Sequence, residues 1–253
     1  MSETFWAALS AIATSAALWV IAWQAILTRK SVQIQAAVAL DSARARLDSQ
    51  APDVVVQLED PTWPPLAWSH MGLPVNPWPH GHIWHFPERE HERIVLQTEV
   101  VVRHFHSGHL EVTFDGDLVD DIDGRPRPAR SVLLAGEDGE HRVLLYKDFT
   151  VKELAENYRA QQDRRPLPHC VQGTITVHDG RDNGVTDTWT LDLTGNPVQP
   201  HESRDGAWIV VPDHLTDGSG LRTLAYERRP ARRRTYWISR QDGLELPAPQ
   251  YTN

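Results

Sequence analysis

The strongest constraint on this chain is an unbroken apolar segment near its start. Residues Phe5 to Leu27 carry no formal charge over 23 positions. At about 1.5 Å per residue, a helix of this length extends roughly 34 Å, which is enough to cross the hydrocarbon core of a bilayer. Trp6 and Trp23 stand near its two ends, where indole rings favour the membrane interface. We therefore expect a transmembrane helix in residues 1–28, in contact with the lipid bilayer through Phe5–Leu27.

Two other structures fit part of this pattern. A cleaved signal peptide needs a basic start and a shorter apolar stretch, and Met1–Thr4 contains neither Lys nor Arg. A uniformly apolar helix buried in a soluble protein remains as the second alternative. Basic residues concentrate after the segment, and they are Arg29, Lys30, Arg44 and Arg46. By the positive-inside rule, this charge bias predicts a single-pass protein of the cell membrane with its C-terminal domain in the cytoplasm.

A helical pattern continues beyond the expected span. Between residues 29 and 51 apolar side chains, mostly alanine, recur at spacings of three or four, and Pro52 ends the pattern. Such a stripe either rests on the protein's own domain or joins two copies of the chain. Alanine buries little area, which favours the first arrangement, and a homo-oligomer through the membrane and juxtamembrane helices is the alternative.

Residues 52–253 have the pattern of a β domain with one helix. Thr150 and Glu153 form a capping box that predicts a helix over residues 150–163. The expected strands are 54–58, 94–106, 110–114, 130–134, 142–146, 171–177, 185–193, 207–211 and 235–239. The fold class is therefore mainly β. It comprises the transmembrane helix, a juxtamembrane helix, and an antiparallel β-sandwich, for which an immunoglobulin-like arrangement is one form, with one inserted short α-helix.

Two pairings follow from the positions of the turns. Segments 94–106 and 110–114 are expected to form a hairpin with a three-residue loop, because this register places Val102 beside Phe114 on one apolar face. A second hairpin, around residues 178–184, is expected to set Gly173 opposite Trp189, where the glycine leaves room for the indole ring.

A segment rich in Trp, Pro and His interrupts the β pattern at residues 61–92. Seven of the 18 prolines lie between Pro61 and Pro87, which excludes a helix or a central strand there. Tryptophan is enriched at binding hot spots, so we expect this long loop to contact a protein partner. The candidate contact residues are Trp63, Trp68, Trp78 and Trp84.

Histidines give a weaker signal for a metal site. Eight of the 13 lie between His70 and His109, and the candidate ligands are His80, His82, His85, His104 and His106. Zinc is the metal that such a set would bind. The hairpin register that gathers ligands around His106 would split the hydrophobic face, and burial should decide the register. We therefore expect no cofactor, with zinc as the alternative.

Charge is unevenly distributed in the β domain. Residues 115–124 contain five aspartates without the spacing of an EF-hand, and a solvated connection is expected there. An arginine cluster near the C-terminus contains Arg228, Arg229, Arg232, Arg233 and Arg234. Anionic lipid headgroups would suit this cluster next to a membrane anchor. The alternative is a charged hairpin that the aspartate-rich stretch partly neutralises. The net charge of −9 and the absence of a known binding module exclude nucleic acid as the expected partner.

Sequence motifs for common catalytic sites are absent. The chain contains no GxGxxG, GxxxxGK[ST], HExxH, GxSxG or CxxC pattern. We therefore expect a membrane-anchored, non-enzymatic interaction or scaffold module. The alternatives are a metal-dependent enzyme using the histidines and a module that binds anionic lipid surfaces.

Overall fold

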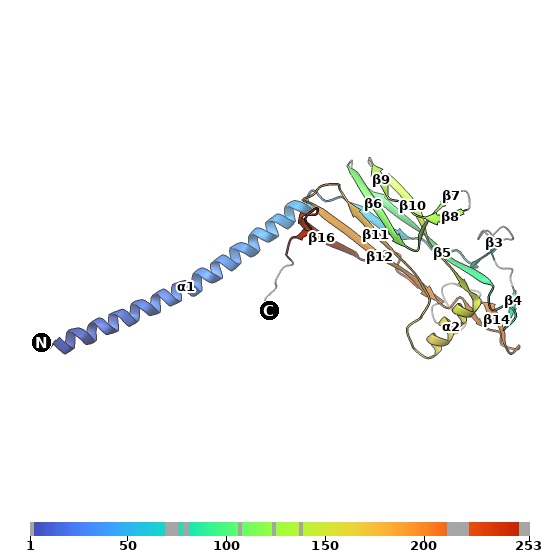
Figure 1. Cartoon of the computed structure of the whole chain (residues 1–253), viewed down its shortest axis with the longest axis horizontal. Coiled ribbons are helices and arrows are strands. Elements are labelled where there is room, and N and C mark those ends of the chain that lie inside the picture. Colours follow the sequence, from blue (N-terminus) through green and yellow to red (C-terminus); the bar gives the residue numbers. More distant parts are fainter. Residues whose placement is uncertain are drawn as a thin grey trace.

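The computed structural model describes residues 3–68, 76–77, 81–105, 108–122, 125–136, 139–211 and 223–247, with side chains at all of these except 3–13, 76–77 and 122. Most of the chain forms a body of β-strands, to which two helices are attached: α1 (Glu3–Asp48) and α2 (Val151–Gln162). Figure 1 shows α1 projecting from one end of this β-body and α2 lying at the opposite end. The helical pattern expected before and after residue 28 is thus one unbroken helix.

The strands belong to three antiparallel sheets. Sheet 1 contains β1 (Val54–Leu58), β2 (Leu66–Ala67), β3 (Asn76–Pro77), β5 (Arg93–His104), β7 (Leu118–Ile122), β8 (Arg125–Pro128) and β10 (Gly139–Thr150). Sheet 2 contains β6 (His109–Gly116), β9 (Val132–Ala135), β11 (Cys170–His178), β12 (Val185–Gly195), β15 (Leu224–Tyr226), β16 (Arg232–Ser239) and β17 (Leu244–Glu245). Sheet 3 contains β4 (Ile83–His85), β13 (Val198–Pro200) and β14 (Ala207–Val210).

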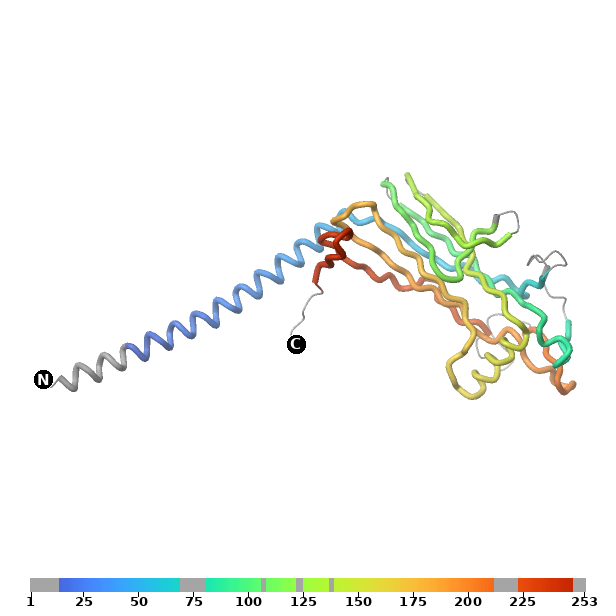
Figure 2. Tube along the Cα trace, viewed as in Figure 1, coloured from blue at the N-terminus to red at the C-terminus, as the bar shows by residue number. Residues whose placement is uncertain are grey.

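Sheets 1 and 2 pack as two layers around one hydrophobic core, as Figure 2 shows. Sheet 1 has the order β3-β2-β5-β10-β7-β8 with β1 also beside β5, and sheet 2 has the order β17-β16-β12-β11-β6-β9 with β15 also beside β12. Every second side chain of β5, from Ile94 to His104, is buried. The same alternation runs along β12 from Val185 to Leu193. The expected sandwich-like arrangement of antiparallel sheets is confirmed.

The expected hairpin between the strands on either side of residue 107 is wrong. β5 pairs with β1 and β10 in sheet 1, whereas β6 pairs with β9 and β11 in sheet 2. Val102 therefore has Val56 and His141 as its cross-strand neighbours instead of Phe114. By crossing between the layers, the chain turns the apolar faces of β5 and β6 toward the same core from opposite sides.

The β11–β12 hairpin forms as expected, but its register is shifted by two residues. Gly173 lies opposite Leu191 instead of Trp189. A Cβ atom on Gly173 would lie 2.8 Å from Leu118 Cγ and 3.1 Å from Leu145 Cδ1, both in sheet 1. The glycine therefore makes room for leucines of the opposite layer, and this packing across the core fixes the register.

Local signals place α2 correctly. The Glu153 amide donates to Thr150 Oγ1 at 3.2 Å, and the Thr150 amide donates to Glu153 Oε2 at 2.7 Å, which completes the capping box.

Two segments expected to be loops contain strands. The acidic run at residues 115–124 is not a simple connection, because it contains β7 with its buried Leu118. Segment 61–92 likewise contains β2, β3 and β4, which are too short for an alternating pattern to reveal.

Candidate functional site

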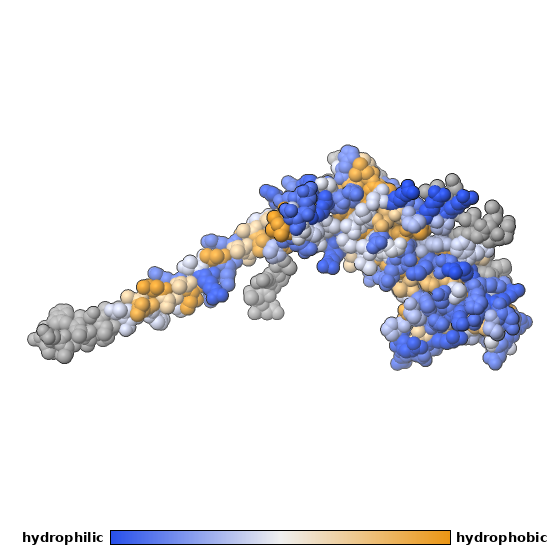
Figure 3. Space-filling view, in the orientation of Figure 1, coloured by the Kyte–Doolittle hydropathy of each residue, from blue (hydrophilic) through white to orange (hydrophobic). Residues whose placement is uncertain are grey.

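The exposed side chains of α1 form an unusual surface. Every side chain from Thr14 to Ala39 is exposed. The four consecutive residues from Leu18 to Ile21 are between 47% and 68% exposed, and together they cover the full circumference of a helix with 3.6 residues per turn. Figure 3 shows this apolar surface along the projecting helix. A helix that is apolar on all sides requires a cover of lipid or protein.

The predicted membrane span lies only partly within the described side chains. Phe5–Leu27 begins among residues 3–13, whose side chains lie outside that part. In the helices as far as their side chains are described, no stretch is long and apolar enough to cross a membrane. The transmembrane anchor therefore remains a prediction.

The last turn of α1 is fastened to strand β16. Asp48 Oδ1 accepts a hydrogen bond from Arg234 Nη1 at 2.7 Å, and the Tyr236 hydroxyl lies 3.1 Å from each oxygen of the same carboxylate. Arg44 donates to the main-chain carbonyl of Pro247, and its guanidinium lies 5.8 Å from the centroid of the Tyr236 ring. The helix is thus joined to strands more than 180 residues away in the sequence.

Further contacts follow directly after the helix. Gln50 accepts two hydrogen bonds of 2.8 Å from Arg181, one through its side chain and one through its main-chain carbonyl. Leu47 is only 5% exposed, and Leu40 and Ala43 are half-buried. The alanine-rich stripe expected in residues 29–51 is therefore covered by the protein's own body only in its last turns.

Asp187 supports this junction from within sheet 2. Its side chain is fully buried, and it accepts hydrogen bonds from Arg234 Nε at 2.7 Å and Nη2 at 2.6 Å. Arg232 Nη1 lies 3.7 Å from the same carboxylate. The bonds to Asp187, followed by the bond to Asp48, raise the pKa of Arg234 above its ordinary value. Both oxygens of a buried carboxylate are thus paired, as the burial of charge requires.

The arginine cluster does not form one basic surface. Arg228 pairs with Asp60, while Arg232 and Arg234 point toward Asp187. Because side chains alternate along β16, Arg233 lies on the other face of the sheet. Arg229 and Arg233 are exposed, and neither has an acidic partner in the described part of the chain. Two of the five candidates therefore remain available to an anionic ligand.

The candidate tryptophans lie in different environments. Trp84 is fully buried and its Nε1 donates to Glu92 Oε2 at 3.1 Å, so its assignment to a contact surface is corrected: it belongs to the core. Trp63 is partly buried and packs against the core, and Trp68 is 36% exposed. Trp78 lies outside the described residues.

The candidate metal ligands are not brought together. His82 Nε2 lies 3.6 Å from Glu92 Oε2, immediately before β5, and its pKa is lowered by burial, against the influence of Glu92. His104 lies at the far end of β5, which extends about 36 Å from Arg93 to His104 at roughly 3.3 Å per residue. His85 is exposed on β4, and His80 and His106 lie outside the described residues. Where the structure is described, no three His, Cys, Asp or Glu side chains could hold a metal ion together.

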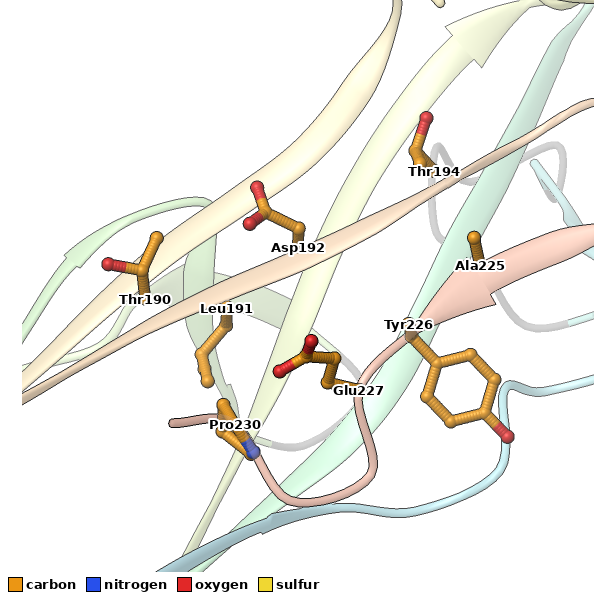
Figure 4. A pocket seen from close by; sticks show the side chains of 8 residues that line it. All are labelled: Thr190, Leu191, Asp192, Thr194, Ala225, Tyr226, Glu227 and Pro230. Carbon is orange, nitrogen blue, oxygen red and sulfur yellow. The ribbon is translucent and has the colours of Figure 1, made fainter. Parts of the chain in front are cut away.

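Two hollows lie beside β15 and share Thr194 and Ala225. The first, the Asp192 hollow, measures about 330 Å³ and lies along the edge of β12 that faces away from β11, between the end of its pairing with β16 and the start of its pairing with β15. Figure 4 shows Thr190 and Asp192 on one side of it and Glu227 and Pro230 on the other. The Tyr226 ring points away, toward Asp60, to which its hydroxyl donates at 2.7 Å.

The second hollow, the Asn196 hollow, measures about 430 Å³. Gln161, Arg164 and Arg165 reach it from the C-terminal end of α2, and Thr194 and Asn196 reach it from the end of β12. Nothing in the sequence marks these residues as a group, since they come from segments about 30 positions apart.

Comparison with protein-family models, with curated proteins and with solved structures gives no significant match.

Proposed function

We propose that the protein is a single-pass membrane protein whose cytoplasmic β-sandwich acts as a non-enzymatic interaction module close to the membrane. The observation that supports this most strongly is α1, which exposes large apolar side chains on all sides from Leu18 to Leu27 and is fastened at its base to β16. Lipid is the medium in which such a surface is stable. Arg29 and Lys30 follow directly and favour the cytoplasmic side for the domain.

The length of α1 favours a protein partner over a lipid surface. From residue 28 to Leu47 the helix extends about 30 Å, at 1.5 Å per residue. Electrostatic attraction to headgroups decays over about 8 Å at physiological salt. In an upright protein, Arg229 and Arg233 would lie well beyond that range. Exposed Trp68 supplies an aromatic contact that suits a protein surface.

The metal-dependent alternative loses its main support. Its ligands would come from the histidines around β4 and β5, but His82 lies beside Glu92, just before β5, whereas His104 is the last residue of β5. A binding role needs no such convergence of ligands.

Membrane extraction tests the anchor. The full chain is expressed in cells, and membranes are washed with alkaline carbonate, which releases peripheral proteins. Wild type should stay in the pellet, whereas the double variant Val20→Arg/Ile21→Arg should be released, because each arginine at the bilayer centre costs about 3 kcal/mol. The matched control Gln33→Arg/Gln35→Arg, outside the span, should behave as wild type. Release of wild-type protein would contradict the anchor.

Site-specific photo-crosslinking tests the interaction role. A photoreactive residue at Trp68 should give a discrete crosslinked protein band in intact cells. The same residue at Arg142, which is engaged in ion pairs with Glu99 and Glu140 on the outer face of sheet 1, serves as the control. Equal crosslinking at both positions, or none at either, would argue against a specific partner at Trp68.

A further inference from the structure

Asn196 is a buried side chain whose polar atoms are not satisfied by the protein. It is 1% exposed, and neither Nδ2 nor Oδ1 has a hydrogen-bond partner among the residues that the structure describes. Gln161 Oε1 and Thr194 Oγ1, on the same Asn196 hollow, are also buried without partners. Burying an amide without hydrogen bonds costs free energy, so several such groups around one hollow indicate a binding site.

A neighbouring asparagine shows that the fold can satisfy such a group. Asn157 on α2 is fully buried, and its Nδ2 donates at 2.7 Å to the carbonyls of His169 and Gly195. Its Oδ1 accepts from the His169 amide at 3.0 Å. Asn196 directly follows Gly195 in the sequence, but its side chain makes no hydrogen bonds like those of Asn157. Of these two buried carboxamides, only that of Asn157 makes hydrogen bonds within the described part of the chain.

The size of the hollow exceeds what a single ordered water would need. Its volume of about 430 Å³ falls in the range of small-ligand sites, which begins near 300 Å³. A water molecule occupies about 30 Å³.

The groups that line the hollow define the chemistry of a ligand. A carboxamide presents a donor and an acceptor side by side, which matches another amide such as a peptide group. Arg164 and Arg165 add positive charge. Arg165 Nη2 binds Asp163 Oδ2 at 2.8 Å, whereas Arg164 has no acidic partner within the described chain. Arginine binds carboxylates through paired hydrogen bonds.

We propose that the Asn196 hollow binds the C-terminal end of a polypeptide, with the Asn196 carboxamide turning from its buried position toward a peptide amide of the ligand and the terminal carboxylate on Arg164. This deepens the proposed interaction role by naming a ligand class. It uses no contact of α1, so its failure is distinguishable from failure of the anchor.

Ligand-observed NMR on the detergent-solubilised full chain tests the proposal, with N-acetylglycylglycine as the probe. The free acid should bind, and its C-terminal amide should bind about ten-fold more weakly because it lacks the charge that Arg164 contacts. Asn196→Leu, which keeps the branched shape and the number of side-chain heavy atoms, should abolish binding of the acid. Absence of binding to wild type, or unchanged binding to Asn196→Leu, would overturn the proposal.

Arg164→Gly separates a ligand role from a structural one. Arg164 has a φ of 55°, in the left-handed region that favours glycine, so this variant should fold at least as stably as wild type. It should nevertheless lose the preference for the acid over the amide. Asp192→Asn, in the neighbouring Asp192 hollow, should keep that preference and serves as the control. Retention of the preference in Arg164→Gly, or its loss in Asp192→Asn, would contradict the assignment.

Discussion

Strand β12 has a buried polar side chain near each of its ends, and the two are treated in opposite ways. Asp187, near the start, is paired on both oxygens with Arg234, which also holds the base of α1. Asn196, one residue after the strand, is equally buried and has no side-chain partner. At the first end, the buried charge of Asp187 is therefore balanced by the protein's own Arg234, and the pair stabilises the fold. The second end has unused hydrogen-bonding capacity, which is the property of a binding site.

The largest expected effect is at the paired end. Asp187→Ala leaves Arg234 half-buried with only Asp48 as a partner, and we expect a loss of about 3 kcal/mol in the free energy of unfolding. Urea denaturation of the solubilised protein measures it. The control is Asp192→Ala on the exposed face of the same strand, which should change stability by no more than about 0.5 kcal/mol. A similar effect for both variants would show that Asp187 is not the support of the junction.

A substitution at Asn196 should change the free energy of unfolding in the opposite direction. Asn196→Leu removes two unsatisfied polar atoms from the interior, so we expect the free energy of unfolding of the ligand-free protein to rise by about 1–2 kcal/mol. The same denaturation experiment applies. Asn157→Leu is the matched control and should destabilise the protein, because it breaks three hydrogen bonds. A destabilised Asn196→Leu would mean that the two buried asparagines play the same structural role.

A smaller effect is expected at the base of α1. Asp48 is partly exposed, so Asp48→Ala should cost only about 1 kcal/mol or less. Its main consequence should be looser attachment of the helix. Pulsed electron resonance between spin labels on α1 and β10 should show a broader distance distribution than in wild type. An unchanged distribution would indicate that Arg44 and Gln50 suffice to hold the helix.

The smallest expected change in stability comes from the protonation of two histidines, one at each end of the sandwich. Burial lowers the pKa of His178, beside β12's start, and of His82, near sheet 3. The unfolded chain therefore takes up protons at a higher pH than the folded one, and stability should fall as the pH drops below about 6.5. Urea midpoints between about pH 7.5 and pH 5.5 measure this fall. His178→Gln should reduce it, and an equal fall in that variant would exclude His178 as a contributor.

Features coded by neighbouring residues could be predicted from the sequence. The capping box of Thr150 and Glu153 places α2, and alternation places β1, β5 and β12. The pairing of strands was harder, because packing between layers decides it. Leu118 and Leu145 fix the position of Gly173 from the opposite sheet, and no pattern within residues 170–195 reveals that contact.

The candidate site depended even more on distant contacts. The arginine run suggested a basic surface, but partners at Asp60, Asp48 and Asp187 engage three of its members. Trp84 suggested a contact surface and is buried instead. The Asn196 hollow had no signal at all, since an asparagine after a strand is an ordinary turn residue until its surroundings are known. The apolar segment of α1 was evident because its length and lack of charge are properties of one continuous stretch.

Spin-label accessibility along α1 tests the central claim most directly. Single cysteines are introduced from Leu18 to Val32 in a Cys170→Ser background, and the full chain is reconstituted in anionic vesicles. We predict that labels between residues 18 and 27 collide with oxygen and are protected from a water-soluble nickel chelate, and that this protection ends near Arg29. Free collision of the nickel chelate with labels between residues 18 and 27 would show that α1 lies in water, and it would contradict the membrane anchor.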